Sequence, residues 1–175
     1  MEPVPAASLL AAMETIAERA PALVEEAVAL GDRIALMRAG RLEQCAPPDE
    51  LYARPATAFA ARFFSDLNEF PGTCRAGRIE TQAGTFDACG LADGACARVC
   101  VRPQHVRLAA GPTPLAGRVV SAEFLGEIDR VVVELGGGRG TVSMRVFGRA
   151  GLEPGDEVFL EIDARHAAIV PDDRD

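Results

Sequence analysis

The sequence predicts an α+β protein, with a short helical segment and one hairpin over residues 1–67 and an all-β barrel over residues 68–175. Apolar residues recur at helical spacing before Asn68 and alternate with polar residues after it. The segment after Asn68 also consists of short β-type runs separated by glycine-rich turns, which is typical of a small barrel that closes on itself. We therefore expect a domain boundary between residues 67 and 68.

The first domain should contain short helices around one hairpin. Leu9, Met13 and Ile16 predict an amphipathic helix over 8–20. Pro21 then begins a second helix that ends before Gly31, because proline is tolerated in the first helical turn. Two apolar runs joined by an Ala-Gly turn follow, and they predict an antiparallel hairpin of residues 33–38 and 41–45.

Two more helices are expected after the hairpin. The first starts at a proline pair and ends before Pro55, with Leu51 and Tyr52 facing inward. Thr57 can cap the second helix through its hydroxyl group. The apolar face of that helix is expected to consist of phenylalanines, namely Phe59, Phe63 and Phe64.

The second domain should be a series of short strands. In chain order, the β-type runs are 72–75, 78–81, 84–87, 97–102, 106–109, 115–123, 130–135, 141–147, 157–162 and 167–170. Alternate residues of these runs should face the core, Val133 among them, and the same assignment includes Leu108, Phe124 and Leu125. Residues 136–140 are glycine-rich but precede no helix, so they predict a hairpin turn rather than a phosphate cradle.

Composition excludes several classes of function. A net charge of −8 and a pI near 4.8 argue against nucleic-acid binding, which requires a basic face. No apolar run approaches the roughly 20 residues of a membrane helix, and the first residues lack the basic start and apolar core of a secretory signal. The expected location is therefore the cytoplasm, with no membrane span and no nucleic-acid partner.

Five cysteines suggest free thiols more than a disulfide framework, because their number is odd and no C-x-x-C pair occurs. Cys89, Cys96 and Cys100 nevertheless cluster within a short segment, and thiolates are ligands for soft metals and iron–sulfur centres. Their spacing fits no ferredoxin-type pattern. Free buried thiols are the expected state, and a metal site at this cluster is the alternative.

A second group of polar residues could bind an anion. Arg102 and Arg107 flank His105, and the guanidinium group offers a fork of donors that suits an oxyanion. Arginines that are exposed or paired with carboxylates give the same pattern. Arg102, His105 and Arg107 are therefore candidate oxyanion contacts, with a surface or packing role as the alternative.

The order of several stretches resembles one family of transport proteins. Residues 25–42, 48–52 and 59–64 resemble the end of the nucleotide-binding domain in ATP-binding subunits of ABC importers, of the kind that serve ferric iron, polyamines and sugars. Residues 101–108, 117–119, 124–126 and 155–158 resemble the C-terminal regulatory domain of those subunits, the TOBE module. The resemblance implies a partial nucleotide-binding domain over 1–67 and an OB-like barrel over 68–175.

The chain departs from that family at the residues that handle ATP. In the family a Thr-His-Asp triplet carries the switch histidine, and Pro21, Ala22 and Leu23 stand at the aligned positions. All 18 basic residues are arginine, so the lysine of a phosphate loop is missing. The acidic pair and the Ser-Gly-Gly-Gln signature of these ATPases are missing too. We therefore expect no ATP hydrolysis, no catalytic residue and no bound cofactor.

The resemblance also implies partners. They are a second copy of the chain, giving a homodimer, or an intact ATPase subunit and through it the membrane permease, which would place the chain peripherally at the inner membrane. Residues 66–72 resemble the linker of the ferric-iron subgroup, so ferric iron is the expected solute.

Two alternatives from other classes stay open. One is a stand-alone barrel that binds an oxyanion or another small ligand, similar to molybdate-binding proteins, with a helical dimerisation arm. The other is a non-functional product of a truncated gene, which the poor match before Leu23 favours.

Overall fold

The computed structural model describes residues 21–88 and 90–172, and the expected helix over 8–20 lies outside them. The chain separates into two compact units, the first ending at Ser65 and the second running from Asp66 to Asp172. Each unit is described by itself below. Among the described residues, no helix combines the length and the apolar character that a membrane span requires.

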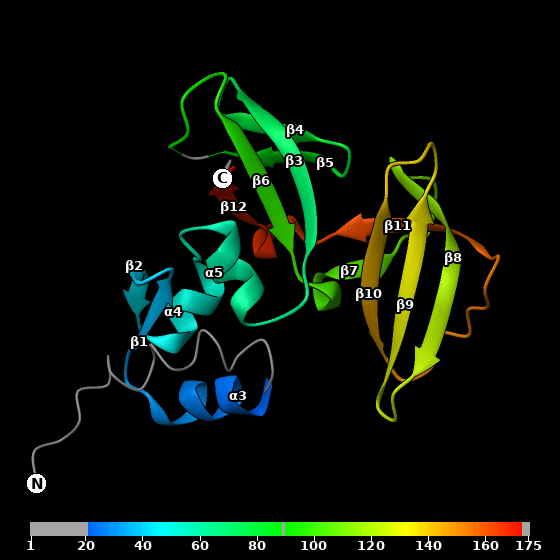
Figure 1. The fold of residues 1–175 in the computed structure, drawn as a ribbon. Helices are drawn as coiled ribbons and strands as arrows, with labels where there is room; N and C mark the ends of the chain where they lie inside the picture. Colours follow the sequence, from blue (N-terminus) through cyan, green and yellow to red (C-terminus); the bar gives the residue numbers. More distant parts are fainter. Residues whose placement is uncertain (1–20, 89, 173–175) are drawn as a thin grey trace, which may run out of the picture. The chain divides into compact units, whose positions relative to one another are not determined.

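Unit 1 contains the short helices and the hairpin that the sequence predicts. Its elements are α3 (Pro21–Leu30), β1 (Ile34–Arg38), β2 (Arg41–Ala46), α4 (Pro48–Ala53) and α5 (Ala58–Phe63) (Figure 1). β1 and β2 pair antiparallel, with a register shift after Leu36. The hydroxyl group of Thr57 accepts a hydrogen bond of 3.2 Å from the Ala60 amide, so the predicted N-cap of α5 is confirmed.

The described core of unit 1 corrects the prediction for Tyr52 and shows which side chains of α5 are buried. Leu51 is fully buried beside Ile34, but Tyr52 is 39% exposed, because adjacent residues of a helix point about 100° apart. α5 buries Ala58, Ala60 and Ala61 rather than a face of phenylalanines. The phenylalanines Phe59, Phe63 and Phe64 are half-buried, and Phe64 packs against the core cluster that contains Leu51.

Unit 2 is mostly β, as the sequence predicts. Its elements are β3 (Asn68–Arg75), β4 (Arg78–Thr81), β5 (Gly84–Asp87), β6 (Cys96–Val101), η1 (Pro103–His105), β7 (Val106–Leu108), β8 (Leu115–Phe124), β9 (Ile128–Leu135), β10 (Thr141–Phe147), β11 (Glu157–Ile162), η2 (Ala164–His166) and β12 (Ala168–Pro171). The expected strand positions agree with these bounds within a few residues.

The strands form two sheets rather than one continuous barrel. The first sheet has the order β12-β6-β3-β4-β5 and the second has the order β10-β9-β8-β11-β7 (Figure 1). The second sheet curls until its outer strands, β10 and β7, come into contact, although they do not join the ladder as paired neighbours. The second sheet thus comes close to forming the closed barrel that the sequence predicts, and the first sheet is not part of that barrel.

The two sheets share one hydrophobic core. Buried side chains from both sheets belong to the same cluster, with Val99 and Val101 from β6 and Val133 and Leu160 from the second sheet. β9 alternates as expected, since Val131, Val133 and Leu135 are buried. Three residues assigned to the core are instead substantially exposed, because Leu108 and Phe124 are the last residues of β7 and β8 and Leu125 lies in the turn after β8.

Two polar contacts join parts of unit 2 that are distant in sequence. The buried Asn68 donates from Nδ2 to the Ser143 carbonyl (2.8 Å) and accepts from the Ser143 amide (2.7 Å). Its side chain therefore provides hydrogen-bond partners for both backbone groups of a residue on the outer strand β10. Arg98 on β6 donates to Glu69 (2.9 Å) and to Asp172 (2.6 Å). These hydrogen bonds, that with Asp172 first, raise the pKa of Arg98 further above its ordinary value.

Candidate functional site

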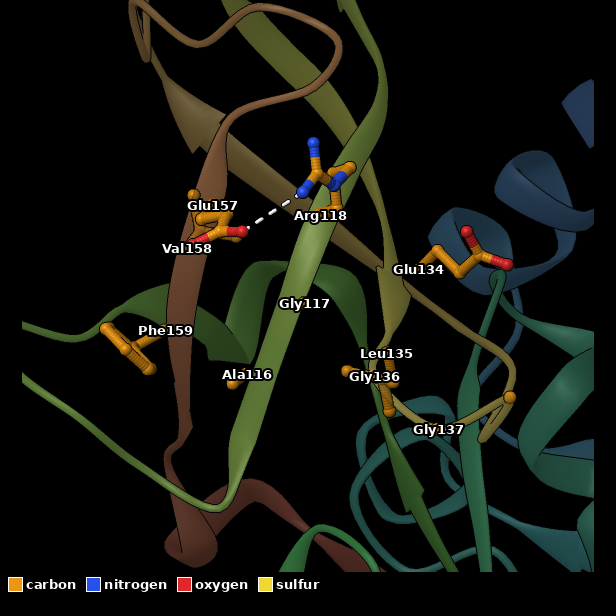
Figure 2. Close-up of a pocket in the computed structure, with 11 residues that line it drawn as sticks. Ala116, Gly117, Arg118, Glu134, Leu135, Gly136, Gly137, Glu157, Val158 and Phe159 are labelled. Atoms are coloured by element: carbon orange, nitrogen blue, oxygen red, sulfur yellow. Dashed lines mark hydrogen bonds and ion pairs between the residues drawn. The ribbon is translucent and has the colours of Figure 1, made fainter.

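An open groove of about 530 Å³ lies on the second sheet. Figure 2 shows that it is bordered by β8, by β11 and by the turn that follows β9. Its lining residues are Ala116, Gly117, Arg118, Glu134, Leu135, Gly136, Gly137, Gly138, Glu157, Val158 and Phe159. Gly117 has no room for a side chain, since a Cβ atom there would lie 2.4 Å from the Glu134 carbonyl oxygen.

The charges of this groove do not favour an anion. The strand register places Arg118 opposite Glu134 on one side and Glu157 on the other. The guanidinium group of Arg118 forms an ion pair of 3.0 Å with Glu157 (Figure 2), and both side chains are more than half exposed, so solvent screens the pair. With two glutamates and one arginine in its lining, the groove does not favour a phosphate.

The glycine-rich segment is a hairpin turn, as predicted. β9 and β10 pair antiparallel on either side of it, and the Leu135 amide donates to the Gly140 carbonyl (2.8 Å). Gly137 and Gly138 have φ angles of 78° and 70°, which glycine adopts at little cost. The Arg139 side chain donates to the Gly136 carbonyl (2.7 Å) and to the Pro114 carbonyl (3.2 Å), so its guanidinium group is engaged by the backbone of the chain.

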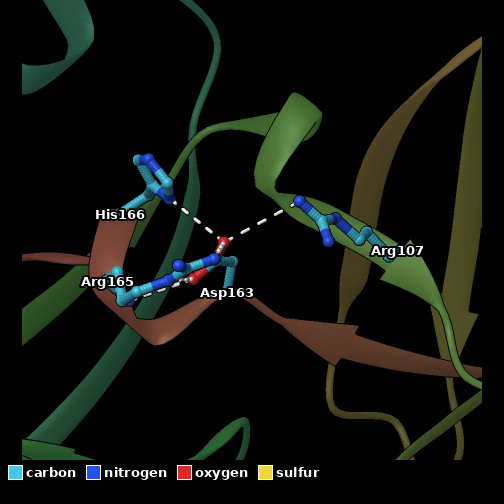
Figure 3. Close-up of polar contacts among 4 residues, drawn as sticks. All are labelled: Arg107, Asp163, Arg165 and His166. Atoms are coloured by element: carbon cyan, nitrogen blue, oxygen red, sulfur yellow. Dashed lines mark hydrogen bonds and ion pairs between the residues drawn. The ribbon is translucent and has the colours of Figure 1, made fainter.

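The predicted anion-binding residues lie around the junction of η1 and β7. Arg102 is buried at the N-cap of η1, His105 ends η1, and Arg107 lies on β7. A guanidinium nitrogen of Arg107 is 3.8 Å from a carboxylate oxygen of Asp163 (Figure 3). Arg107 therefore faces a carboxylate of the chain itself.

Asp163 is the centre of this polar cluster. Its carboxylate accepts hydrogen bonds from Arg165 at 2.9 and 2.7 Å, and Nδ1 of His166 lies 3.2 Å away (Figure 3). The Arg165 hydrogen bond holds the pKa of Asp163 well below its ordinary range, although desolvation opposes this shift. The carboxylate of Asp163 is thus an anion of the chain itself that lies between Arg107 and Arg165. Binding of an external oxyanion by Arg102, His105 and Arg107 stays a prediction.

Sequence reasoning missed Asp163, Arg165 and His166. The short spacing of Asp163 and Arg165 is a local signal, because an aspartate before a turn often accepts from the amide two residues later, as it does here at 3.2 Å. No local signal could have paired His105 with His166. Their rings stack with centroids 4.0 Å apart although 61 positions separate them, and only the fold brings them together.

The cysteine cluster receives no support from strand geometry. Cys89 lies outside the described residues, Cys96 is exposed at the start of β6, and Cys100 is buried near its end. Four residues of strand span about 13 Å, whereas two thiolates on one zinc ion each lie about 2.3 Å from the metal. Within 21–88 and 90–172, no group of three or more candidate ligands gathers at one point.

Comparison with known proteins identifies the family. Residues 99–170 match the model of the TOBE domain. The spermidine/putrescine import ATP-binding protein PotA of Rubrobacter xylanophilus is 32% identical over 160 residues, which cover 83% of this chain and 42% of that protein. The Fe(3+) ions import ATP-binding protein FbpC 2 of Rhodococcus jostii is 31% identical over 141 residues, covering 78% of this chain and 41% of that protein.

The chain spans about two fifths of the length of these relatives, at 42% and 41%. A solved structure of the cytoplasmic molybdate-binding protein ModG overlaps 59% of this chain and 96% of its own, with a TM-score of 0.48 and 23% sequence identity. An overlap of that extent decides neither the fold nor a ligand. Residues 99–170 thus form a TOBE domain, and the chain is a relative of the ATP-binding subunits of ABC importers.

Proposed function

We propose that this chain acts as the C-terminal regulatory portion of an ABC importer ATP-binding subunit and does not itself hydrolyse ATP. The observation that supports this most is that similarity to import ATP-binding proteins covers 83% of the chain, with a TOBE match over 99–170. In this proposal unit 1 is the last part of a nucleotide-binding domain and unit 2 is the regulatory domain. The chain would then work in the cytoplasm, at the inner face of a membrane permease.

The surface of unit 1 supports an association role. Among the described residues of unit 1, the core cluster consists of Ile34, Ala46 and Leu51, with a few partly buried neighbours. Leu30 and Leu42 are 85% and 62% exposed, and Val28 is also exposed. Apolar side chains left in water are stabilised when a partner covers them. We infer that this partner is a second copy of the chain or an intact ATPase subunit.

The transported solute is a finer proposal. Residues 66–72 resemble the linker of the ferric-iron subgroup, and Fe(3+) import proteins are among the relatives. Relatives named for polyamine import and for sulfate import, the latter in Methylococcus capsulatus, have nearly the same identity of 32%. The linker is therefore what favours ferric iron over the other solutes.

Nucleotide binding tests the non-catalytic part of this proposal. We expect Mg-ATP to bind the chain no more tightly than a millimolar Kd, about 4 kcal/mol of binding free energy, because no lysine is present to reach the phosphates. Calorimetric titration measures this directly, with an import ATPase that has an intact phosphate loop as the positive control. A micromolar Kd for this chain would contradict the proposal.

Self-association tests the partner surface. We expect the chain to dimerise in the micromolar range, and the double variant Leu30→Glu/Leu42→Glu to dimerise at least about tenfold more weakly, because two charged groups would need to lose their water. Sedimentation equilibrium provides the measurement. Phe147→Glu is the matched control, since Phe147 is 85% exposed but belongs to unit 2. A wild-type chain that stays monomeric at high micromolar concentration would refute the homodimer.

A further inference from the structure

The chain passes between the two sheets of unit 2 at two places, and each place carries a histidine. β6 belongs to the first sheet and β7 to the second, with η1 and His105 between them. β11 belongs to the second sheet and β12 to the first, with η2 and His166 between them. The sequence contains no other histidine, so both imidazoles of the chain lie at these crossings.

The two crossings are held against each other by side chains and by backbone. The imidazole rings are nearly parallel, with an angle of 3° and centroids 4.0 Å apart. The Asp163 amide donates to the His105 carbonyl (3.0 Å), which ties the start of η2 to the end of η1. The His166 amide then donates to the Asp163 carbonyl (3.0 Å), so backbone hydrogen bonds through Asp163 connect the two stacked histidines.

The charges around His105 oppose a proton on its ring. Desolvation by burial lowers the pKa of His105 below 6.5, His166 lowers it further, and Arg102 and Arg107 act in the same direction. Asp163 acts in the opposite direction, but its carboxylate is already engaged by Arg165. β10 also packs against η1, and its charged residue, Arg145, is paired with Asp66 (3.5 Å).

We propose that the stacked His105–His166 pair is an acid-sensitive clamp between the two crossings of unit 2. With His105 neutral, the rings stack and the backbone contact between Asp163 and His105 stays closed. A proton on His105 places a positive charge against His166, Arg102 and Arg107, and the crossings open locally. Mild acid would thereby loosen the connection between the two sheets. This clamp lies within unit 2 and does not depend on the transport assignment.

The direction of the pH effect follows from the lowered pKa of His105. Below 6.5 the unfolded or opened chain takes up a proton that the closed form resists, so the stability of the closed form falls as the pH drops from 6.5 toward the folded pKa. Above 6.5 that stability is fully present. The pKa of Asp163 is lowered from 3.8, so its contribution is lost only in stronger acid. Solutions between pH 5 and 7 therefore isolate the histidine effect.

Nuclear magnetic resonance of the full chain can test the clamp. Two imidazole signals are expected, and His105 should titrate below 6.5. Between pH 7 and pH 5, the hydrogen-exchange protection factors of the Asp163 and His166 amides should fall, because a proton on His105 favours the open crossings. The Leu135 and Gly148 amides, which donate across the two ends of the β9–β10 hairpin, serve as internal controls and should keep their protection.

The variant His105→Gln keeps a neutral polar group at the same place and should abolish the pH dependence of the Asp163 amide. Arg118→Gln, in the groove away from the junction, should leave that dependence unchanged. Equal protection of Asp163 at both pH values in the wild-type chain would overturn the proposal, as would an equal loss of protection in His105→Gln. If the His105 variant does not fold, the comparison of Asp163 protection at pH 7 and pH 5 in the wild-type chain tests the proposal by itself.

Discussion

Replacement of Val133 by aspartate is expected to lower the free energy of unfolding of the chain by about 3–5 kcal/mol, the cost of a buried charge without a partner. Val133 is 0% exposed on β9 and belongs to the core that both sheets share. Its strand neighbours across the ladder are Val119 and Val142, so no cation faces the new carboxylate from the paired positions. Denaturant unfolding followed by far-ultraviolet circular dichroism measures the loss.

Val120→Asp is the matched control for that substitution. Val120 lies on β8 of the same sheet but is 52% exposed, so an aspartate there keeps its water and should change the free energy of unfolding by less than about 0.5 kcal/mol. Equal losses in the two variants would mean that the inward orientation of Val133 is wrong.

Replacement of Asn68 by alanine is the second large effect that we expect, with a loss of about 2–4 kcal/mol. The Asn68 amide makes two hydrogen bonds of 2.8 and 2.7 Å to the backbone of Ser143, and its side chain is buried. Alanine would leave both Ser143 groups unsatisfied, and each unsatisfied buried group costs about 1–3 kcal/mol. Thermal unfolding of the full chain, monitored by circular dichroism, would report the change.

Gln82→Ala provides the comparison for Asn68. The Gln82 amide makes one hydrogen bond of 3.1 Å, to the Arg139 carbonyl, and Gln82 itself is half-buried whereas Asn68 is buried. Water can replace it, so the expected loss is below about 1 kcal/mol. If Asn68→Ala costs no more than Gln82→Ala, then Asn68 does not link β3 to β10 in solution.

Local signals predicted the elements well because they depend on neighbouring residues. The helix over 21–30 and the strands over 78–81, 84–87, 141–147 and 157–162 have the expected bounds. Thr57 caps α5 through a bond to a residue three positions away. The inward orientation of Tyr52 was wrong, and the phenylalanines predicted as the apolar face of α5 are only half-buried, because the pattern shows which residues are apolar but not which of them the core will cover.

The candidate site was predicted only in part, for a related reason. Arg102, His105 and Arg107 were recognisable as a short polar cluster, but their neighbours Asp163 and His166 come from the far end of the barrel sequence. A single sequence does not say which distant charge will neutralise which cation. The groove beside Gly117 was equally unpredictable, since it arises from the side-by-side placement of β8, β9 and β11.

The sequence by itself determined the mostly-β character of residues 68–175 and the missing lysine, because short-range periodicity and composition carry them, and the order of its short motifs carried the resemblance to import ATPase subunits. Only the tertiary structure decided that the strands divide into two sheets with one core, that Asn68 satisfies the backbone of β10, and that His105 stacks on His166. These features depend on contacts between residues about 60 to 75 positions apart. Such contacts form where burial of apolar surface outweighs the entropy of closing a long loop, and that balance belongs to the whole fold.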